Sequence, residues 1–216
     1  MAEGKRAPCT RYKLVLFDFD GTLADSAEWF LQRINELADE FKFRRIEEAD
    51  YERMRNYSTE QIIEHMAMPR WRLPILLRRM RKAAAEDSGV IKLFPGAMRM
   101  LKELRAAGIC VGIVSSNDEA NIRLVLAAEG KEISFYECGA SLFGKASKLK
   151  RVLRRSGFQP SETIYIGDEL RDAVASRKAE IAFGAVAWGY TSIETLRREK
   201  PEMEFKEMSE IVRKLV

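Results

Sequence analysis

Short apolar runs alternate with longer amphipathic stretches along most of the chain. Four runs rich in β-branched and aromatic side chains span residues 14–17, 109–114, 163–166 and 183–188. Runs of this length and composition are typical of parallel strands buried on both faces. Between them, apolar residues at helical spacing predict helices over 97–107, 120–128 and 147–156. The order strand, helix, strand predicts an α/β fold built on a doubly wound parallel sheet.

The segment from residue 24 to residue 90 interrupts this alternation directly after the first apolar run. It shows no convincing strand pattern, and its helical spacing predicts helices over 26–41, 47–55, 59–66 and 73–85. Doubly wound sheets bind ligands at the carboxyl ends of their strands, so an insert at this place predicts a helical cap or lid. We therefore expect an α/β core over 12–23 and 91–216, a cap over 24–90, and a loose lead-in over 1–11 without a signal peptide.

The composition is that of an ordinary globular protein. Of 216 residues, 46% are hydrophobic and 32% are charged, which allows one domain or a core with a smaller insert. The net charge of +4 is mild, and without a concentrated basic stripe it predicts no nucleic-acid partner. Since no apolar stretch approaches the roughly 18 residues of a membrane span, no membrane association is predicted.

The three cysteines, Cys9, Cys110 and Cys138, show no CxxC spacing. An odd number without such spacing is more typical of a reduced cytoplasmic protein than of a disulfide framework. We therefore predict a cytoplasmic protein, and the sequence leaves its oligomeric state open.

Two aspartates follow the first apolar run, where a parallel strand would end. Asp18 and Asp20 stand two residues apart and are followed by Gly21. Two carboxylates that converge on one point are costly unless a cation neutralises them. Mg²⁺ commonly binds one or two carboxylates together with phosphate oxygen and water, and a carboxylate can attack phosphorus to form an aspartyl phosphate. The pair therefore predicts phosphate chemistry with magnesium, against the alternative of a turn with solvated acids.

The later strand ends supply further polar groups. Ser115, Ser116 and Asn117 follow the second run, and they offer hydroxyl and amide groups for a phosphate oxygen. Asp168 and Asp172 follow the third run, four residues apart, so they can share one face at a helix start. Lys145 and Lys148 lie between these segments, and either lysine could neutralise charge at the site.

These segments, taken in order, resemble the motifs of the haloacid-dehalogenase superfamily. Residues 16–26, LFDFDGTLADS, are similar to its first motif, and residues 114–117, VSSN, resemble the second. Gly144-Lys145 stands where the lysine of the third motif is expected, and YIGD at 165–168, continued to Asp172, resembles the fourth. The resemblance runs from about residue 12 to the C-terminus. It points to the phosphoglycolate-phosphatase-like branch, which implies a Rossmann-like core with a helical cap.

The resemblance implies a phosphatase that works through an aspartyl-phosphate intermediate. Asp18 would be the nucleophile, and Asp20 would protonate the leaving oxygen and then activate water. Lys145 would stabilise the charge around the nucleophile. Its distance from Asp168 fits the family better than that of Lys148, which stays open as the alternative.

The resemblance also implies a Mg²⁺ ion and a phosphorylated substrate. The ion would be held by Asp18, the backbone carbonyl of Asp20 and Asp168, with Asp172 as a ligand either directly or through a water. The substrate would be a small phosphorylated metabolite, with phosphoglycolate as the first to try. Its contacts would come from Thr22, Ser115, Ser116 and Asn117.

The chain departs from the family pattern at two places, and two alternative functions stay open. Ala146 follows Lys145 where a proline is usual, and Ala179-Glu180 stands where Ala-Gly is frequent. The presence of Asp20, as the resemblance implies, separates the chain from metal-independent dehalogenases. It does not separate a phosphatase from a sugar-phosphate phosphomutase. A catalytically silent domain that binds a ligand or partner is the non-enzymatic alternative.

Overall fold

The computed structural model describes residues 11–87, 89–139 and 144–216. Residues 1–10, which include Cys9 and most of the expected lead-in, lie outside the described residues. The strands are β1 (Leu14–Phe17), β2 (Ala24–Asp25), β3 (Lys92–Leu93), β4 (Cys110–Val114), β5 (Phe135–Glu137), β6 (Thr163–Gly167), β7 (Ala182–Val186) and β8 (Met203–Phe205). The helices are α1 (Ala27–Phe41), α2 (Glu48–Met54), α3 (Thr59–His65), α4 (Leu73–Glu86), α5 (Ala97–Ala106), α6 (Glu119–Leu126), α7 (Lys145–Ser156), α8 (Leu170–Ala179), α9 (Ile193–Arg197) and α10 (Met208–Leu215). Within these described ranges, no helix combines the length and the apolar character that crossing a membrane requires.

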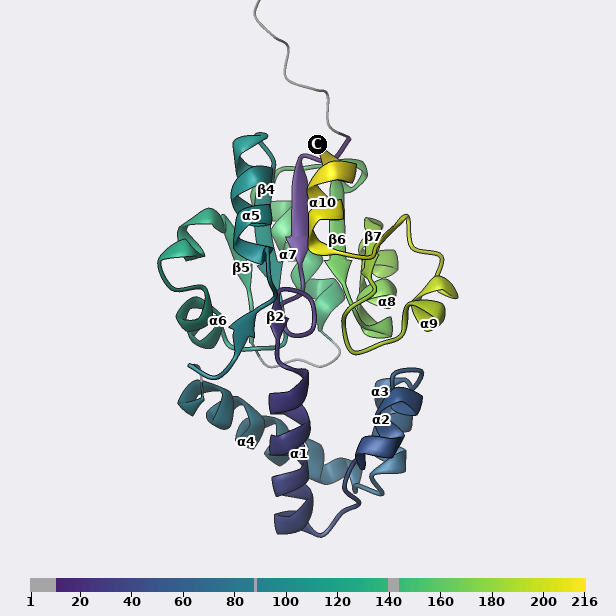
Figure 1. Ribbon diagram of the computed structural model, residues 1–216. Coiled ribbons are helices and arrows are strands. Elements are labelled where there is room, and N and C mark those ends of the chain that lie inside the picture. Colours follow the sequence, from purple (N-terminus) through teal and green to yellow (C-terminus); the bar gives the residue numbers. More distant parts are fainter. Residues whose placement is uncertain (1–10, 88, 140–143) are drawn as a thin grey trace, which may run out of the picture.

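Six parallel strands form the central sheet in the order β5-β4-β1-β6-β7-β8 (Figure 1). The first strand lies inside the sheet, paired with β4 on one side and with β6 on the other. All four of its residues are buried, as expected for a strand that helices cover on both faces. The predicted α/β fold with a doubly wound parallel sheet is confirmed.

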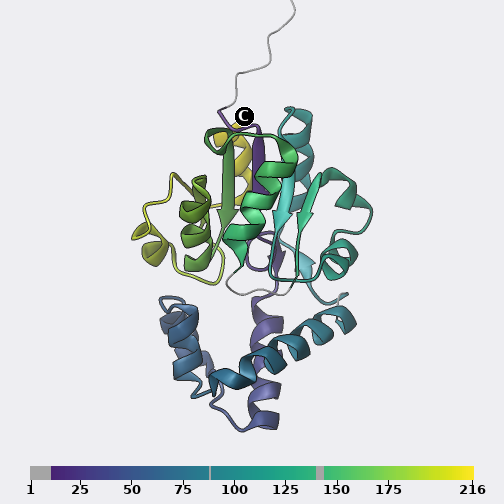
Figure 2. The ribbon, with the colours of Figure 1, turned by 180° about the vertical axis from the view of Figure 1, so that it is seen from behind.

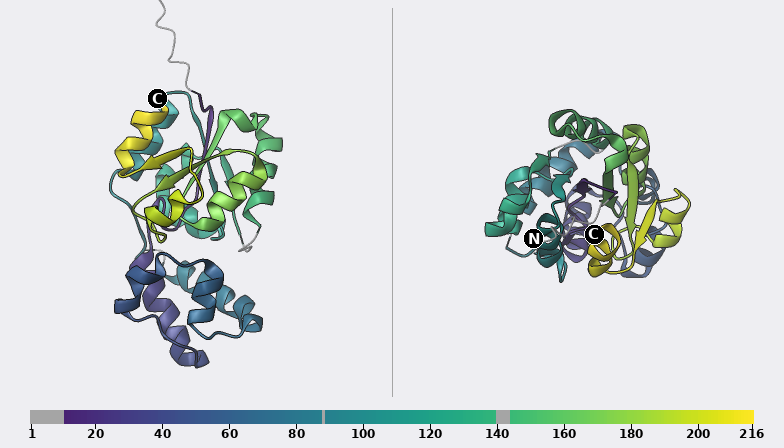
Figure 3. Two further views of the ribbon diagram at one scale, coloured as in Figure 1. Left: turned by 90° about the vertical axis from the view of Figure 1, so that its right-hand side faces the viewer. Right: turned by 90° about the horizontal axis from the view of Figure 1, so that it is seen from above.

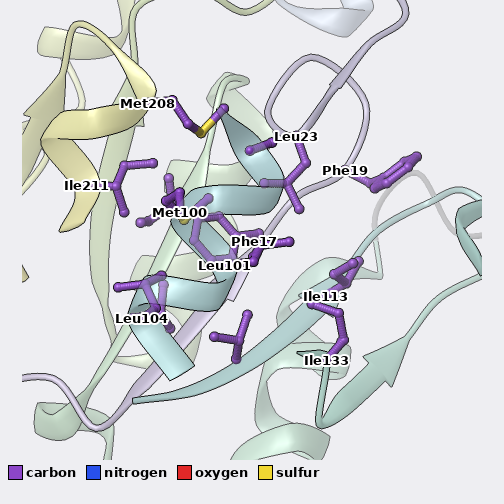
Figure 4. Packing of buried hydrophobic residues seen from close by; sticks show 14 of the residues in the cluster. Phe17, Phe19, Leu23, Met100, Leu101, Leu104, Ile113, Ile133, Met208 and Ile211 are labelled. Atoms are coloured by element: carbon purple, nitrogen blue, oxygen red, sulfur yellow. The ribbon is translucent and has the colours of Figure 1, made fainter. Parts of the chain in front are cut away.

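Side chains of β1 alternate between two hydrophobic layers. Val15 and Phe17 belong to a cluster with α5 and α10, and Figure 4 shows Phe17 beside Leu101 of α5 on this face. Leu14 and Leu16 belong to a second cluster on the opposite face, which α7 and α8 cover (Figure 2). Because both layers bury apolar surface against β1, the position of its last residue, and of the polar residues that follow, is fixed from two sides.

The helices α1–α4, here called the helical insert, lie beyond the carboxyl ends of the strands (Figures 1 and 3). The chain leaves the core through β2 and returns through β3, and these strands pair antiparallel. The insert has a hydrophobic cluster of its own, to which Ile34, Ile63 and Met80 belong. The insert therefore holds together around its own apolar side chains and faces the edge of the sheet where ligands are expected.

The structure corrects the predicted elements at a few places. The expectation of no strand between residues 24 and 90 is wrong at its start, because β2 lies there; it is only two residues long and leaves no alternating pattern. The strand predicted over 183–188 runs over Ala182–Val186 as β7. Pattern analysis also missed the edge strands β5 and β8, which are three residues long and each contain a glutamate. Edge strands this short lack the continuous apolar run that marks a central strand.

Candidate active site

The chain turns sharply after β1 and places two aspartates at the carboxyl edge of the sheet. The backbone N–H groups of Leu23 and Ala24 both donate to the carbonyl oxygen of Phe19 at 2.9 Å, which closes a tight loop. Asp18 is 2% exposed, and Asp20 is partly buried within this loop. The loop therefore holds both carboxyl groups close to the end of a buried strand.

Lys145, the first residue of α7, reaches Asp18 at this edge. Its Nζ donates to Oδ2 of Asp18 and to Oδ1 of Asp172, and all three side chains are almost completely buried. Burial alone lowers the pKa of the Lys145 ammonium, but the carboxylates of Asp172 and Asp18 outweigh it and raise that pKa above its ordinary value. Lys148 instead donates to the backbone carbonyl oxygens of Ser115 and Gly139, each at 2.6 Å. The structure thus places Lys145, and not Lys148, against Asp18.

Asp168 and Asp172 lie at the end of β6 and in the first turn of α8. The Oδ2 atom of Asp172 accepts from the N–H groups of Asp168 at 3.2 Å and Glu169 at 3.0 Å, as in a capping box. Asp168 accepts from the Thr22 hydroxyl and from the N–H of Tyr190, both at 2.8 Å. Burial first, and neighbouring carboxylates second, raise the pKa of Asp168 well above its ordinary value.

The acids of the site form a set of oxygen donors that fits a hard cation. Ligand oxygens of Asp18, Asp168 and Asp172 all lie within 4.8 Å of one another. Buried oxygen donors of this kind suit Mg²⁺. The backbone also approaches Asp168 closely at two glycines: a Cβ at Gly189 would lie 2.1 Å from the Cβ of Asp168, and one at Gly21 would lie 2.3 Å from its Oδ2. Gly21 in addition adopts a φ of +75°, which favours glycine.

Asp20 is held by donors from two other segments. Asn117 Nδ2 donates to its Oδ2 and Ser26 Oγ donates to its Oδ1, both at 3.0 Å. The Tyr190 hydroxyl lies 2.7 Å from Ser26 Oγ; when Asp20 is ionised, the single Ser26 proton is directed at Asp20 and Tyr190 donates to Ser26. Burial first, and the charge of Asp18 second, raise the pKa of Asp20 to about 6. Asp20 is therefore a carboxyl group with a fixed orientation and an affinity for a proton.

In the segment between β4 and α6, polar side chains accept hydrogen bonds from the backbone just before the helix begins. Ser115 Oγ accepts from the N–H of Asn117 at 3.1 Å, and Asn117 Oδ1 accepts from the N–H of Asp118 at 2.8 Å. Ser115 is almost completely buried, whereas Ser116 lines a cavity together with Asn117. Thr22, which the resemblance offers as a substrate contact, is fully buried with its hydroxyl on Asp168.

A cavity of about 280 Å³ lies between this edge of the sheet and the helical insert. Asp20, Ser116, Asn117 and Arg171 are among the core residues that line it. Arg171 donates through Nη2 to Glu169, whereas its Nε and Nη1 are buried and have no hydrogen-bond partner among the residues that the structure describes. Two guanidinium nitrogens of Arg171 beside the cavity are therefore covered from solvent and left without a hydrogen-bond partner.

Sequence reasoning did not select Ser26, Tyr190 or Arg171. Each had a usable signal: Ser26 closes the first motif, Tyr190 follows a strand whose carboxyl end meets the same sheet edge, and Arg171 lies between the two acids of the fourth motif. An isolated serine, tyrosine or arginine is common on any surface, so only the geometry separates these three from the rest.

Comparisons with known proteins agree with this arrangement. The family model described as haloacid dehalogenase-like hydrolase matches residues 15–186. A phosphoglycolate phosphatase of Synechococcus elongatus is 33% identical over 190 residues, which cover 87% of this chain and 90% of that protein. A phosphoglycolate phosphatase of Xylella fastidiosa is 29% identical over 197 residues, which cover 84% of this chain and 83% of that protein.

Solved structures share the fold at lower identity. A haloacid dehalogenase-like family hydrolase of Streptococcus pneumoniae superposes with a TM-score of 0.73 at 18% identity, covering 94% of this chain and 98% of that one. CbbY of Rhodobacter sphaeroides, solved in complex with phosphate, superposes with a TM-score of 0.72 at 17% identity, covering 93% and 96%. The family match over most of the chain and the relative at 33% identity show that the chain belongs to the haloacid dehalogenase-like hydrolase family, as a phosphatase of its phosphoglycolate-phosphatase-like branch.

Proposed function

We propose that the chain is a Mg²⁺-dependent phosphatase that hydrolyses a small phosphate monoester through an aspartyl phosphate on Asp18. The observation that carries this proposal is the contact of Lys145 with Asp18. Asp20, two residues further along the chain, lines the cavity. Phosphoglycolate is the first substrate to test, because relatives from several bacteria are named phosphoglycolate phosphatase.

Two displacements at phosphorus account for the reaction. In the first, a carboxylate oxygen of Asp18 attacks phosphorus, the bond to the alcohol oxygen breaks, and Asp20 gives a proton to that oxygen. In the second, Asp20 takes a proton from water, whose oxygen attacks phosphorus; the bond to Asp18 breaks and phosphate leaves. Lys145 keeps a positive charge beside Asp18 throughout, which favours the charge developing on the phosphoryl oxygens.

The remaining polar side chains divide into phosphate contacts and positioning residues. We propose that the segment Ser115–Asn117 and the unpaired N–H groups of Arg171 bind the phosphate. Thr22 is better assigned as a positioning residue, because its hydroxyl already donates to Asp168. Thr22 would therefore affect the reaction only through Asp168, the proposed metal ligand that it orients.

The proposed Mg²⁺ would be held by Asp18, Asp168 and the backbone carbonyl of Asp20, with Asp172 as a ligand directly or through a water. When bound, it supplies positive charge that neutralises and orients the phosphate. Support comes from the carboxylate oxygens within 4.8 Å of one another and from the burial that disfavours the charge of Asp168. Asp168 accepts hydrogen bonds from the Thr22 hydroxyl and the Tyr190 N–H, and these two bonds fix the orientation of its carboxylate before a ligand binds.

We further propose that residues 12–23 and 91–216 act as the catalytic core and that residues 24–90 act as a cap. The insert lies beyond the carboxyl ends of the strands (Figure 3) and supplies most of the residues that line the cavity, which supports this division. Opening of a cap admits substrate, and closing it excludes bulk water from the reacting groups. A reducing, cytoplasmic location is also proposed, since Cys110 and Cys138 are free thiols.

The test is phosphate release from purified protein with phosphoglycolate, pyrophosphate and a set of sugar phosphates, in Mg²⁺ or in EDTA. Asp18→Asn is the variant, and Asp25→Asn is its matched control, because Asp25 belongs to the same loop region but is exposed. We expect release in Mg²⁺ only, its loss in Asp18→Asn, and its retention in Asp25→Asn.

Failure has a defined meaning in this assay. If folded wild-type protein releases no phosphate from any member with Mg²⁺ present, the phosphatase proposal is wrong. The assay is then repeated with a sugar bisphosphate, because a phosphomutase would convert a sugar phosphate in its presence and release little phosphate. Equal activity of Asp18→Asn and wild type would overturn the assignment of the nucleophile.

A further inference from the structure

The cavity above the catalytic aspartates changes character along its length. Its core end is polar, with Asp20, Asn117 and Arg171 among its lining residues. The end inside the helical insert is lined mostly by aliphatic and sulfur-containing side chains, including Ile34, Ile63 and Met80. Resting on the proposed phosphatase function, we infer that the preferred substrate is a phosphate monoester whose alcohol carries an apolar chain, and that this chain occupies the cavity inside the insert.

The apolar wall of the cavity is the hydrophobic cluster of the insert itself. Ile34, Ile63, Leu76 and Met80 belong to that cluster and also line the cavity. The space therefore lies directly against the side chains that form the hydrophobic cluster of the insert. An apolar ligand that fills such a space recovers the contacts that the helices leave unmade.

The polarity gradient matches the two halves of such a substrate. A phosphate at the core end would lie beside Arg171 and Asn117, which both line the cavity there. Beyond it, an alkyl chain would lose no hydrogen bonds to water, whereas a second anionic group would be buried against aliphatic side chains at a large cost. Of the cationic residues that the insert brings to the cavity, Arg81 already donates through Nε to the carbonyl oxygen of Leu77 at 3.0 Å.

Methionines make this wall adaptable. Met54, Met66, Met68 and Met80 all line the cavity, and three of them lie outside the helix α4 that carries Met80. A methionine side chain has three rotatable bonds and a polarizable sulfur, so it adjusts to ligands of different shape. We therefore expect graded selection by chain length rather than a sharp requirement for one alcohol.

The competing occupant is a short carboxylate such as that of phosphoglycolate. Arg55 favours it, because its Nε is buried and lacks a hydrogen-bond partner within the described part of the chain. However, Arg55 is held against the core, because its Nη2 donates to the carbonyl oxygen of Gly189 at 3.2 Å. A carboxylate held there would leave the apolar end of the cavity unfilled.

The experiment measures kcat/KM for the holoenzyme in Mg²⁺ with n-alkyl phosphates from methyl to octyl, and with phosphoglycolate. All the alkyl leaving groups are primary alcohols, so differences along the series report contacts in the cavity rather than leaving-group chemistry. We expect kcat/KM to rise by up to about fourfold per added methylene until the cavity is filled, which is the fold-change that about 0.8 kcal/mol per buried methylene gives. We also expect hexyl phosphate to surpass phosphoglycolate.

A variant pair locates the effect. Leu76 is buried in the insert and lines the cavity, whereas its neighbour Ile75 is 41% exposed on the outer face of the same helix. Leu76→Phe should shorten the cavity and lower the ratio of hexyl to methyl phosphate kcat/KM by about tenfold, equivalent to losing nearly two methylene contacts. Ile75→Phe is the matched control, and it should leave the ratio unchanged.

The outcomes separate this inference from the proposed function. A flat or falling alkyl series, with phosphoglycolate hydrolysed well, overturns the apolar substrate and leaves the phosphatase intact. An unchanged ratio in folded Leu76→Phe also overturns it. If Leu76→Phe does not fold, the wild-type series decides alone. Absence of release from every ester, phosphoglycolate included, is a failure of the proposed phosphatase and not of its selectivity.

Discussion

The hydrogen bond from Thr22 to Asp168 offers a sharp test of how the site is built. Thr22 Oγ1 donates to Oδ1 of Asp168 at 2.8 Å, and both side chains are completely buried. Thr22→Val keeps the shape of the side chain but removes this donor. The carboxylate of Asp168 then retains the N–H of Tyr190 as its other donor, on Oδ2.

The magnitude follows from the charge of the acceptor. A hydrogen bond to a charged group contributes about 1.5–3 kcal/mol, against about 0.5–1.5 kcal/mol for a neutral pair. The matched control is Thr163→Val, because Thr163 is also completely buried and its hydroxyl donates to the carbonyl oxygen of Gln159 at 3.0 Å, away from the site. With Mg²⁺ present and Asp168 ionised, Thr22→Val should therefore lose at least about 1 kcal/mol more of the free energy of unfolding than Thr163→Val.

Function should separate the two variants further. Since Thr22 orients a proposed metal ligand, Thr22→Val should need about ten- to one-hundredfold more Mg²⁺ for half-maximal phosphate release. Urea unfolding in Mg²⁺ gives the stability, and a Mg²⁺ titration of activity gives the second quantity. Equal stability losses in the two variants, with an unchanged Mg²⁺ requirement, would refute the reasoning. A raised KM for the phosphate ester alone would instead support the substrate contact that the family resemblance implies for Thr22.

Three further predictions concern charge, space and metal. Lys145→Met removes the cation shared by two buried carboxylates, and in urea unfolding with EDTA it should cost about 3–5 kcal/mol of unfolding free energy. Its control is Lys150→Met at an exposed position, which should stay within about 0.5 kcal/mol of wild type in the same titration. Gly189→Ala places a Cβ against Asp168, so it should cost about 1–3 kcal/mol of unfolding free energy and most of the phosphatase activity. Its control is Gly89→Ala, where a Cβ meets nothing within 4 Å, and this variant should change neither the urea unfolding nor the activity. Mg²⁺ at one hundred times its Kd should raise unfolding free energy by about 2.7 kcal/mol in calorimetry, and an equal gain in Asp168→Asn would contradict the assigned ligand.

Central strands were readable from the sequence because burial on both faces leaves a continuous apolar run. The run at 14–17 coincides with β1, and the run at 163–166 is extended only by Gly167 in β6. Strands β5 and β8 lie at the edges of the sheet and contain partly exposed residues, so their sequences carry no such run. The strand β2 escaped prediction for a related reason, since its pairing with β3 depends on residues almost seventy positions away.

The site was readable as far as strand ends determine it. Asp18, Asp168 and the segment Ser115–Asn117 each follow a strand of one parallel sheet, so the fold brings them to one edge. The choice between Lys145 and Lys148 needed the path of helix α7, because the two lysines lie less than one turn apart. The sequence could not assign the role of Thr22 either. A hydroxyl in a phosphate-binding motif can donate equally well to the phosphate or to a neighbouring carboxylate.

The contacts of the site also suggest how chemistry and selectivity are kept apart. Asp18 is held by the N–H of Phe19 and by Lys145, and the side chain of Asp168 is held by Thr22 and the N–H of Tyr190, all of them outside the helical insert. Changes in the insert can therefore alter the cavity without breaking these side-chain contacts of Asp18 and Asp168.

Asp20 is the exception, because its side chain contacts the start of the insert, and the proton transfer proposed for it would therefore depend on the position of the insert. Its oxygen accepts from Ser26, the residue directly before α1, and Ser26 in turn contacts Tyr190. Tyr190 also packs against Phe30 of α1, with ring centroids 6.0 Å apart. Movement of α1 would shift the groups around the carboxyl that carries the proton and leave Asp18 in place. If the insert acts as the proposed cap, its closure over a substrate would thus act first on Asp20, the proposed general acid.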